Sequence, residues 1–325
     1  MKNFIDYYYR LFRLYLSYVG RKTKVSSPPV RLWIELTSHC NLKCVMCPNK
    51  DLTSKNKGYM DFELFKKIVD ESKDFVFDIS LLHRGESLLH PEFLKFLNYA
   101  TRFNWKTKLH TNGTLLTEEI SRGIIESRLS RISFSFDGYQ PKTYEKIRVG
   151  AKFDEVVDNI KKLLTLKKEM KSTTPVVAIE LIDFPNSEIS DEGKKREFLK
   201  NFEGLGLNEV IVKKIHNWAG YIRTKNTKIH FTPCTFLWNG LIILWDGTAM
   251  PCAQDFFEHY PLESVKDKSI KEIWNGERLV NLRDKHVKQN ISDIQTCNSC
   301  DRVWRKTFLG IPTESLWDFI RRKMP

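Results

Sequence analysis

Three cysteines stand close together near the start of the chain, at Cys40, Cys44 and Cys47. Their spacing, C-x-x-x-C-x-x-C, brings three thiolates into one short loop directly after the apolar stretch 32–36. Three thiolates can hold three irons of a 4Fe-4S cube and leave the fourth iron without a protein ligand, which is where chemistry can take place. A structural zinc site normally has four protein ligands, so zinc fits this loop poorly.

A second group of four cysteines stands toward the C-terminus, at Cys234, Cys252, Cys297 and Cys300. Four thiolates can ligate a second 4Fe-4S cluster completely, and the same set also fits a four-thiolate zinc site. A completely ligated cluster has no open iron, which leaves electron transfer or structural support as its roles. The spacing predicts a second metal centre and leaves both its metal and its role open.

The composition favours a reducing compartment for these cysteines. The chain has seven cysteines, an odd number, with no cleavable signal peptide and no run of about 18 apolar residues. Metal binding therefore fits them better than disulfides, and a cytoplasmic location is expected. The net charge of +13 suits either an anionic partner or a solvated basic surface. The basic residues form no long tract, so no nucleic-acid partner is expected.

From residue 30 apolar strands alternate with helical patterns, which is the rhythm of a parallel β/α sheet. The strands are expected at 30–36, 76–82, 106–110, 131–136, 175–181 and 208–214, with helices near 61–73, 91–104, 117–128, 153–171 and 189–205 between them. Thr117 and Ser190, each followed by acidic residues, mark two helix starts. A parallel sheet has its ligand site at the C-terminal strand ends, which is where the first cysteine loop should lie.

After about residue 220 this rhythm breaks. Short strands are expected at 227–233 and 241–252, the latter around an Asp246-Gly247 turn, and one helix is expected near 268–287. We therefore expect three parts, namely an N-terminal helix and linker at 1–29, a barrel at 30–220, and a small Cys-rich domain with a tail at 221–325.

The first 24 residues have the pattern of an amphipathic helix. One apolar face is formed by Phe4, Tyr8, Leu11, Tyr15 and Tyr18, with basic residues around it. Such a helix either packs on the domain or lies at a membrane surface, which would make the protein peripheral at the inner face of the membrane.

The first cysteine loop resembles that of the radical SAM (S-adenosylmethionine) superfamily, and the likeness runs in order over residues 30–300. It implies an α/β fold, an incomplete (β/α)6 TIM-like barrel, with Cys40, Cys44 and Cys47 as ligands of a 4Fe-4S cluster and Met46 near the SAM adenine. In that family SAM chelates the open iron, and its reductive cleavage yields a 5′-deoxyadenosyl radical that abstracts a substrate hydrogen atom. A flavodoxin- or ferredoxin-type protein would donate the electron.

Further motifs of the superfamily recur at the strand ends. Its Gly-Gly-Glu motif, which contacts the SAM amino group, is Arg-Gly-Glu at 84–86, where Arg84 either alters the backbone or reaches the substrate. A Thr-Asn-Gly turn stands at 111–113, and a Ser-x-Asp-Gly pattern stands within 133–138. The resemblance implies that SAM contacts come from Gly85, Glu86, Asn112, Ser133, Ser135 and Asp137.

The segment from Cys234 to Cys252, with Gly247 in a G-x4-C pattern, resembles the SPASM module and its shortened Twitch form, which hold auxiliary 4Fe-4S clusters. Full SPASM modules have further cysteines after the C-x-x-C motif, and none follows Cys300. The likeness implies one auxiliary cluster, as in members that oxidise an alcohol carbon of an aminocyclitol. His216, at the end of the sixth strand, would take a proton from a substrate hydroxyl.

These features fit two enzymatic functions. The first is the two-electron oxidation of a polyol, aminocyclitol or sugar-type small molecule, which the single auxiliary cluster and the basic charge favour. The alternative is a peptide- or protein-modifying SPASM maturase, although only about thirty residues precede the first strand, too few for a separate leader-binding domain. A third interpretation is a non-catalytic zinc protein that contacts nucleic acid, which would contain zinc in place of iron.

Overall fold

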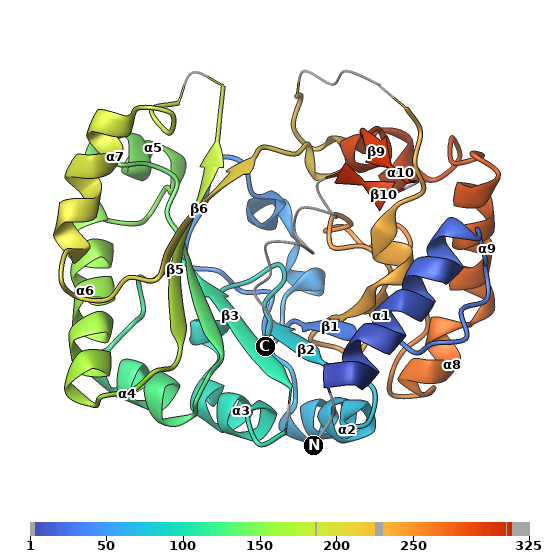
Figure 1. The fold of residues 1–325 in the computed structure, drawn as a ribbon, viewed down its shortest axis with the longest axis horizontal. Helices are drawn as coiled ribbons and strands as arrows, with labels where there is room; N and C mark the ends of the chain where they lie inside the picture. The colour runs from blue at the N-terminus through green and yellow to red at the C-terminus, as the bar shows by residue number, and fades with distance from the viewer. Residues whose placement is uncertain (1–3, 104, 186, 225–229, 310, 314–325) are drawn as a thin grey trace.

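The computed structural model describes residues 4–103, 105–185, 187–224, 230–309 and 311–313. Its centre is a curved sheet of eight strands in the order β6-β5-β4-β3-β2-β1-β7-β8 (Figure 1). Strands β1 to β7 are parallel to their neighbours, and β8 pairs antiparallel with β7. The strands are β1 Arg31–Ile34, β2 Asp78–Leu81, β3 Lys106–Thr111, β4 Arg131–Ser135, β5 Val176–Asp183, β6 Glu209–Lys214, β7 Gly240–Ile243 and β8 Ala249–Met250. The predicted open (β/α)6 barrel is confirmed.

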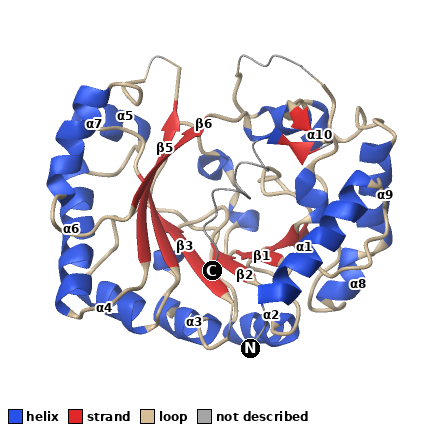
Figure 2. Cartoon of the chain, in the orientation of Figure 1, coloured by secondary structure: helices blue, strands red, loops and turns tan. Residues whose placement is uncertain are grey.

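Helices cover the convex face of this sheet, because each crossover between parallel strands packs an apolar helix stripe against it (Figure 2). They are α2 Phe62–Ser72, α3 Phe93–Ala100, α4 Glu118–Glu126, α5 Pro141–Ile147, α6 Phe153–Glu169 and α7 Glu192–Leu199. Thr117 caps α4 as predicted, accepting from the Ile120 N–H at 3.2 Å. The cap of α7 is Asp191, one residue after the predicted Ser190, since its carboxylate accepts from two backbone N–H groups.

The structure differs from the predicted elements in three places. Helix α5 was not predicted, because its short sequence offers little apolar periodicity. The single helix predicted at 268–287 is two helices, α8 Ile270–Trp274 and α9 Glu277–Val287, with Gly276 between them. Of the strand predicted at 227–233, residues 227–229 lie outside the described residues, and the rest forms one isolated bridge from Phe231 to Trp304. Residues 314–325, at the end of the predicted domain and its tail, also lie outside the described residues.

The C-terminal third of the chain packs beside β1. Strand β7 extends the barrel sheet, with Gly240 opposite Arg31, and turns into β8 through Asp246 and Gly247, whose φ of +93° suits glycine. Helix α10, Gln295–Asn298, and the strand pair β9 Thr307–Phe308 and β10 Ile311–Pro312 complete this region. The division of the chain at residue 220 stays a prediction, since β7 belongs to the same sheet as the barrel.

Helix α1, Phe4–Val19, docks on this C-terminal region. Its Leu14 and Tyr18 are buried, and the Tyr18 hydroxyl donates to the Pro233 carbonyl at 2.9 Å. The segment after the helix is fixed as well, because the Trp238 indole donates to the Lys22 carbonyl at 2.8 Å. None of the described helices is long and apolar enough to cross a membrane.

Candidate functional site

The first cysteine loop leaves the C-terminal end of β1, as the barrel prediction requires. It carries Cys40, Cys44 and Cys47. Its middle is held against the end of α5 and the segment after it, because the backbone N–H groups of Lys43 and Val45 donate to the carbonyls of Val149 and Ile147 at 2.9 and 3.0 Å. The position of the loop is therefore set by the fourth strand-helix unit as well as by β1.

The ends of β1 and β2 are fixed to each other around this loop. The Asn49 side-chain amide donates to the carbonyls of Ser38 at 2.7 Å and Arg84 at 2.8 Å. The Glu86 N–H donates to the His39 carbonyl at 2.8 Å. Gly85 lies so close that a Cβ there would stand 2.2 Å from the Thr37 carbonyl oxygen. Gly85 is therefore required for this approach, and the loss of the preceding glycine to Arg84 is tolerated.

The thiols of this loop are free and suit a metal cluster. Burial, the largest cause, raises the pKa of Cys40 to about 12 and that of Cys47 to about 11. The backbone N–H groups of Leu42 and Asn49 donate to these two sulfurs and oppose that shift in pKa. Such thiols lose their protons when a cationic metal binds, so the donors fit an iron-sulfur cluster.

Glu86 lies at the junction of β2 and β3 and is fully engaged by protein donors. Its buried carboxylate accepts from the Thr111 hydroxyl at 2.8 Å, the Asn112 N–H at 2.7 Å and the Leu88 N–H at 3.2 Å. Burial raises the pKa of this carboxyl despite these donors. The Asn112 amide in turn donates to the Asn41 side chain, inside the cysteine loop, at 3.0 Å. Glu86 and Asn112 thus shape the loop, and their contacts with SAM stay a prediction.

Asp137 connects β4 to the cysteine loop through an arginine. Its buried carboxylate forms an ion pair with Arg148, whose guanidinium lies 3.7 Å from the Cys44 sulfur. The other Asp137 oxygen accepts from the Ile182 N–H at 2.7 Å. The geometry therefore gives Asp137 a positioning role for Arg148, and a direct SAM contact stays a prediction.

The remaining predicted SAM contacts lie around the same strand ends. Ser133 is buried and accepts from the Arg131 guanidinium at 3.3 Å, and Ser135 is half-buried at the end of β4. Met46 is buried in the main hydrophobic core. Their contacts with SAM stay predictions.

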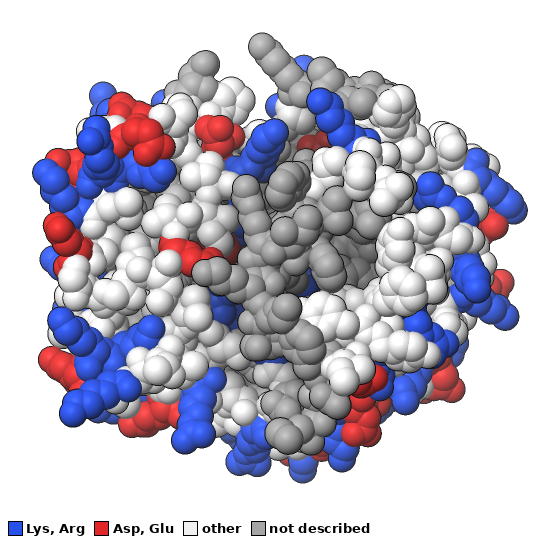
Figure 3. Space-filling view, in the orientation of Figure 1, with Lys and Arg blue, Asp and Glu red and all other residues white. Residues whose placement is uncertain are grey.

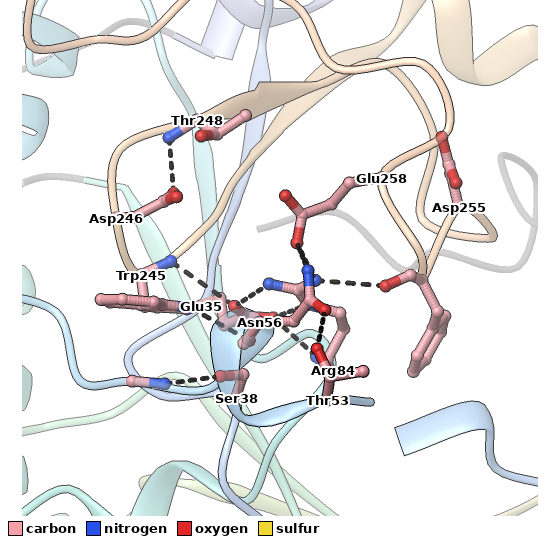
Figure 4. A network of polar contacts seen from close by, with 12 residues as sticks. Glu35, Ser38, Thr53, Asn56, Arg84, Trp245, Asp246, Thr248, Asp255 and Glu258 are labelled. Carbon is pink, nitrogen blue, oxygen red and sulfur yellow. Dashed lines mark hydrogen bonds and ion pairs between the residues drawn. The ribbon is translucent and has the colours of Figure 1, made fainter. Parts of the chain in front are cut away.

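Arg84 joins the barrel to the C-terminal region (Figure 4). Its guanidinium, which is not exposed, binds both Glu35 oxygens at 2.8 Å, the Glu258 carboxylate at 2.6 Å and the Phe256 carbonyl at 3.1 Å. Glu35 also accepts from the Arg84 N–H at 3.1 Å. With its donors occupied in this way, Arg84 is placed to hold β1, β2 and the segment after Cys252 together. Contact with a substrate is the less favoured role.

The second cysteine group gathers four thiols from three separate segments. Cys234, Cys252 and Cys297 line one cavity. Burial, the largest cause, raises the pKa of Cys252 well above its usual range, and the neighbouring Cys234, Cys300 and Cys297 raise that pKa further. Backbone N–H groups of Gln254 and Arg302 donate to the sulfurs of Cys252 and Cys300 at 3.3 and 3.4 Å. No three His, Cys, Asp or Glu side chains among the described residues are packed as tightly as the ligands of a single ion.

His286 on α9 connects two of these cysteines. Its ring is buried and neutral, since burial lowers the pKa of His286 to about 4. The Cys234 N–H donates to the His286 Nδ1 at 3.3 Å, so the ring proton is on Nε2. This Nε2 lies 3.4 Å from the Cys297 sulfur. His286 therefore donates a hydrogen bond to a predicted cluster ligand. Sequence analysis missed this residue because a single histidine on a helix gives no motif.

The loop after β6 connects the barrel mouth to the Cys297–Cys300 segment. The Asn217 amide donates to the Ser299 carbonyl at 2.6 Å, and its oxygen accepts from the Asp301 N–H at 3.2 Å. The Asp301 carboxylate accepts from the Asn217 N–H at 2.8 Å. These three bonds place the second cysteine group at the edge of the barrel mouth.

His216 precedes this junction. Burial and the nearby Arg302, Arg305 and Lys213 lower the pKa of His216 to about 3. The Trp218 N–H donates to its Nδ1 at 3.3 Å, which leaves the ring proton on Nε2. In this geometry the free ring nitrogen is a hydrogen-bond donor, so His216 suits the orientation of an oxygen atom better than the predicted removal of a proton.

The concave face of the sheet carries a charged layer near the mouth. Since Leu109, Thr111, Ile179 and Leu181 are buried toward the helices, the alternate residues of β3 and β5 face the opposite side. There Glu180 pairs with Lys213 and lies 3.6 Å from His110. Burial, the largest cause, raises the pKa of Glu180. The opposing effects of His110 and Lys213 together exceed that of burial, so the pKa of Glu180 lies below its usual range. Glu180 is therefore an ionised carboxylate at neutral pH.

Two protein families match this architecture. Residues 34–181 match the radical SAM superfamily, and residues 234–301 match SPASM, an iron-sulfur cluster-binding domain. The chain thus carries a radical SAM domain followed by a C-terminal SPASM domain. These families imply a SAM-binding 4Fe-4S cluster, SAM itself and an auxiliary iron-sulfur cluster. The match at 234–301 favours iron over the zinc alternative for the second cysteine group.

Relatives that align over most of the chain have different activities. The chain is 24% identical to the tungsten-containing aldehyde ferredoxin oxidoreductase cofactor-modifying protein of Pyrococcus furiosus, over 84% of this chain and 89% of that protein. It is 21% identical to the S-adenosyl-L-methionine-dependent 2-deoxy-scyllo-inosamine dehydrogenase of Niallia circulans, over 88% and 96%. Mycofactocin maturase MftC of Mycobacterium tuberculosis is 28% identical, but over only 42% of this chain and 34% of its own length.

Solved structures confirm the fold. BtrN in complex with AdoMet and 2-DOIA superimposes with a TM-score of 0.58 at 20% identity, covering 85% of this chain and 94% of BtrN. Streptococcus suis SuiB bound to the precursor peptide SuiA gives a TM-score of 0.62 at 15% identity, over 87% and 72%. The expected likeness to an aminocyclitol dehydrogenase is therefore confirmed in both sequence and structure.

Proposed function

We propose that this chain is a radical SAM oxidoreductase that removes two hydrogen atoms from a polyol, aminocyclitol or sugar-type small molecule. Cys40, Cys44 and Cys47 would hold the SAM-binding cluster, and the four remaining cysteines would hold one auxiliary cluster. The observation that carries the proposal is the pair of hydrogen bonds that joins Asn217 to Ser299 and Asp301, on either side of Cys300. They hold a four-cysteine site, which has no open iron, beside the barrel mouth, where it suits electron transfer.

When bound, the first cluster and SAM would supply the 5′-deoxyadenosyl radical that takes one hydrogen atom from the substrate carbon, and the auxiliary cluster would accept the electron left when a proton departs. The protein's task is to receive that proton and to orient the substrate. Glu180, ionised and on the concave face, is the proposed proton acceptor. His216 would hold the substrate oxygen through its Nε2 proton.

The charged concave face supports a small polar substrate. Besides Glu180 and Lys213, it carries the ion pair of Arg131 and Glu209 at 2.7 Å and that of Lys108 with Asp78, which lie toward the N-terminal ends of their strands, deeper than the mouth. Such a charged surface favours a polar substrate, whose hydroxyl and amino groups lose water on binding and need polar partners in its place. The dehydrogenase relative acts on 2-deoxy-scyllo-inosamine, by its name, which is a molecule of this kind.

A second candidate function is the modification of a peptide or protein. Mycofactocin maturase MftC and the SuiB structure with its precursor peptide favour it. The SuiB structure shares the fold at 15% identity. The two functions differ in their products, because a maturase forms a changed peptide and a dehydrogenase forms a ketone or aldehyde from an alcohol.

We also propose a flavodoxin- or ferredoxin-type protein as the electron donor. The net charge of +13 would attract an acidic redox protein. We expect electron transfer from such a donor to slow as ionic strength rises, since salt screens attraction between exposed charges.

The test is an anaerobic incubation of the iron-loaded enzyme with reductant, SAM and a panel of cyclitols, aminocyclitols and sugars deuterated at the carbinol carbon. We expect deuterium in 5′-deoxyadenosine and a product that has lost one deuterium and one hydrogen atom. Glu180→Gln should retain SAM cleavage and lower product formation by about 10²-fold or more, with Glu197→Gln, at an exposed carboxylate on α7, as the matched control. Deuterium transfer from a peptide, with none from any alcohol, would assign the maturase function instead.

A further inference from the structure

Helix α1 has a second apolar face that the docked helix leaves in solvent. The face predicted from the sequence, which includes Tyr18, packs on the protein together with Leu14. The opposite side carries a stripe at the spacing i, i+4, i+7, i+11 and i+14, which is continuous on a helix. Its residues and exposed fractions are Ile5 70%, Tyr9 56%, Phe12 55%, Leu16 48% and Val19 39%. We call these five residues the outer stripe.

An exposed apolar stripe of this kind indicates a binding surface. A helix that is apolar on both sides is normally buried on both sides, and contiguous exposed apolar patches mark interaction sites. The helix is not loosely attached, because the Tyr18 hydroxyl, the Lys22 carbonyl and the Thr23 carbonyl are hydrogen-bonded to the C-terminal region. The outer stripe is therefore presented on a fixed face of the folded protein.

The charges around the stripe are cationic. Asp6 is the one acidic residue in the first 24 positions, and Arg10 neutralises it at 3.0 Å. Arg13 lies along the edge of the stripe over the Tyr9 ring, and Arg21, Lys22 and Lys24 follow its C-terminal end in exposed positions. In Figure 3 the surface over α1 is mostly uncharged, with Lys and Arg side chains at its margins.

We propose that the outer stripe binds the surface of an anionic membrane, with the stripe in the interface and the basic residues at the lipid phosphates. An in-plane amphipathic helix with a basic margin is the arrangement that such surfaces bind. A second copy of the chain fits the stripe less well, because a two-fold dimer would bring the two cationic margins together. The proposal is independent of the reaction that the barrel performs.

The experiment is co-sedimentation of the full-length, iron-loaded protein with vesicles of phosphatidylcholine alone or mixed with phosphatidylglycerol. We expect binding to the mixed vesicles at low salt, with weaker binding at high salt and on phosphatidylcholine alone. The double variant Phe12→Ser/Leu16→Ser should bind roughly tenfold more weakly or worse, because two large apolar side chains no longer enter the interface. Lys22→Glu/Lys24→Glu should lose a similar factor.

Val212→Ser is the matched control, because Val212 on β6 is 46% exposed, a fraction similar to the 48% of Leu16. It should bind like the unchanged protein, and circular dichroism should show that all variants fold. The proposal is overturned if the unchanged protein does not bind mixed vesicles at low salt, or if the Phe12/Leu16 variant binds them equally well. A third outcome also overturns the proposal. If the unchanged protein forms concentration-dependent dimers but does not bind vesicles, and the Phe12/Leu16 variant no longer dimerises, the outer stripe binds a second copy of the chain.

Discussion

The two cysteine groups are built in opposite ways. The first takes its three cysteines from one loop, and the second takes four from three segments between Cys234 and Cys300. The first has a cation beside a sulfur, the Arg148 guanidinium near Cys44 at 3.7 Å, whereas the second has the neutral His286 beside Cys297 at 3.4 Å. The first lies at the end of a strand, and the second lies between a hairpin and two helix ends.

This difference shows what each group can do. A loop that contributes only three sulfurs leaves one iron open to a ligand such as SAM. Four sulfurs saturate a cluster, which then can exchange electrons but cannot bind a further ligand. The proposed oxidation requires both properties in one molecule and a fixed distance between them. The Arg84 ion pairs and the Asn217 hydrogen bonds provide that fixed relation.

The largest expected effects come from removing one cysteine from each group. Cys40→Ala should lower the iron content from about eight to about four atoms per chain and abolish SAM cleavage. Cys297→Ala should lower the iron content equally but retain SAM cleavage, with loss of the oxidised product. Iron analysis, 5′-deoxyadenosine and product are measured on the same samples.

The comparison of the two groups fails if Cys297→Ala leaves the iron content unchanged, because the second group would then not hold a cluster. It also fails if this variant forms the oxidised product at the normal rate. In that case the second group would be a structural site, and the electron would leave the substrate by another route.

The next largest effect should come from Arg84, which connects the two regions. Arg84→Met leaves the Glu35 carboxylate buried without its partner, so we expect the free energy of unfolding to fall by roughly 3–5 kcal/mol. Urea denaturation of the iron-loaded protein measures it. Glu258→Gln should cost less, since Glu258 is partly exposed, and Lys95→Ala, in a surface pair with Glu92, should cost under about 1 kcal/mol.

If Arg84→Met is no less stable than Lys95→Ala, the ion-pair network does not hold the regions together. A stable Arg84→Met that has lost activity would instead restore the substrate contact predicted from the sequence.

A smaller effect should follow from two histidines at the same junction. His83 contacts Phe256 with 5.4 Å between ring centroids, and His216 lies near Arg302. Burial, followed by nearby arginines, lowers the pKa of each to about 3. Below about pH 6.5 the unfolded chain therefore binds protons that the folded chain does not, and stability falls as the pH decreases from 6.5 toward 3.

Each histidine should contribute about 1.4 kcal/mol per pH unit in that window. Urea midpoints measured between pH 7 and pH 5 should show this slope in the unchanged protein and a smaller one in His83→Gln and in His216→Gln. An equal slope in all three proteins would mean that other groups cause the acid sensitivity.

The sequence was sufficient for the contiguous features and insufficient for the assembled ones. The alternation of strands and helices, the Cys40 loop and the turn at Gly247 follow from local periodicity and spacing. Glu35, Asn49 and His286 were not predicted, because each acts on a group that is distant in sequence, such as Arg84 or Cys297. The outer stripe of α1 was also missed, since helical spacing alone does not tell which of two apolar faces a protein covers.

The smallest effect sharpens the contrast between Arg148 and His286. His286→Phe removes the hydrogen bond to Cys297, which is worth about 1 kcal/mol, and should lower the potential of the auxiliary cluster by roughly 40 mV, because charge added on reduction loses a donor. Arg148→Gln should lower the potential of the first cluster and leave the auxiliary one unchanged. Redox titration followed by electron paramagnetic resonance separates the two signals. Equal shifts of both clusters in either variant would show that the two sites respond to overall charge and not to the neighbour that each one contacts.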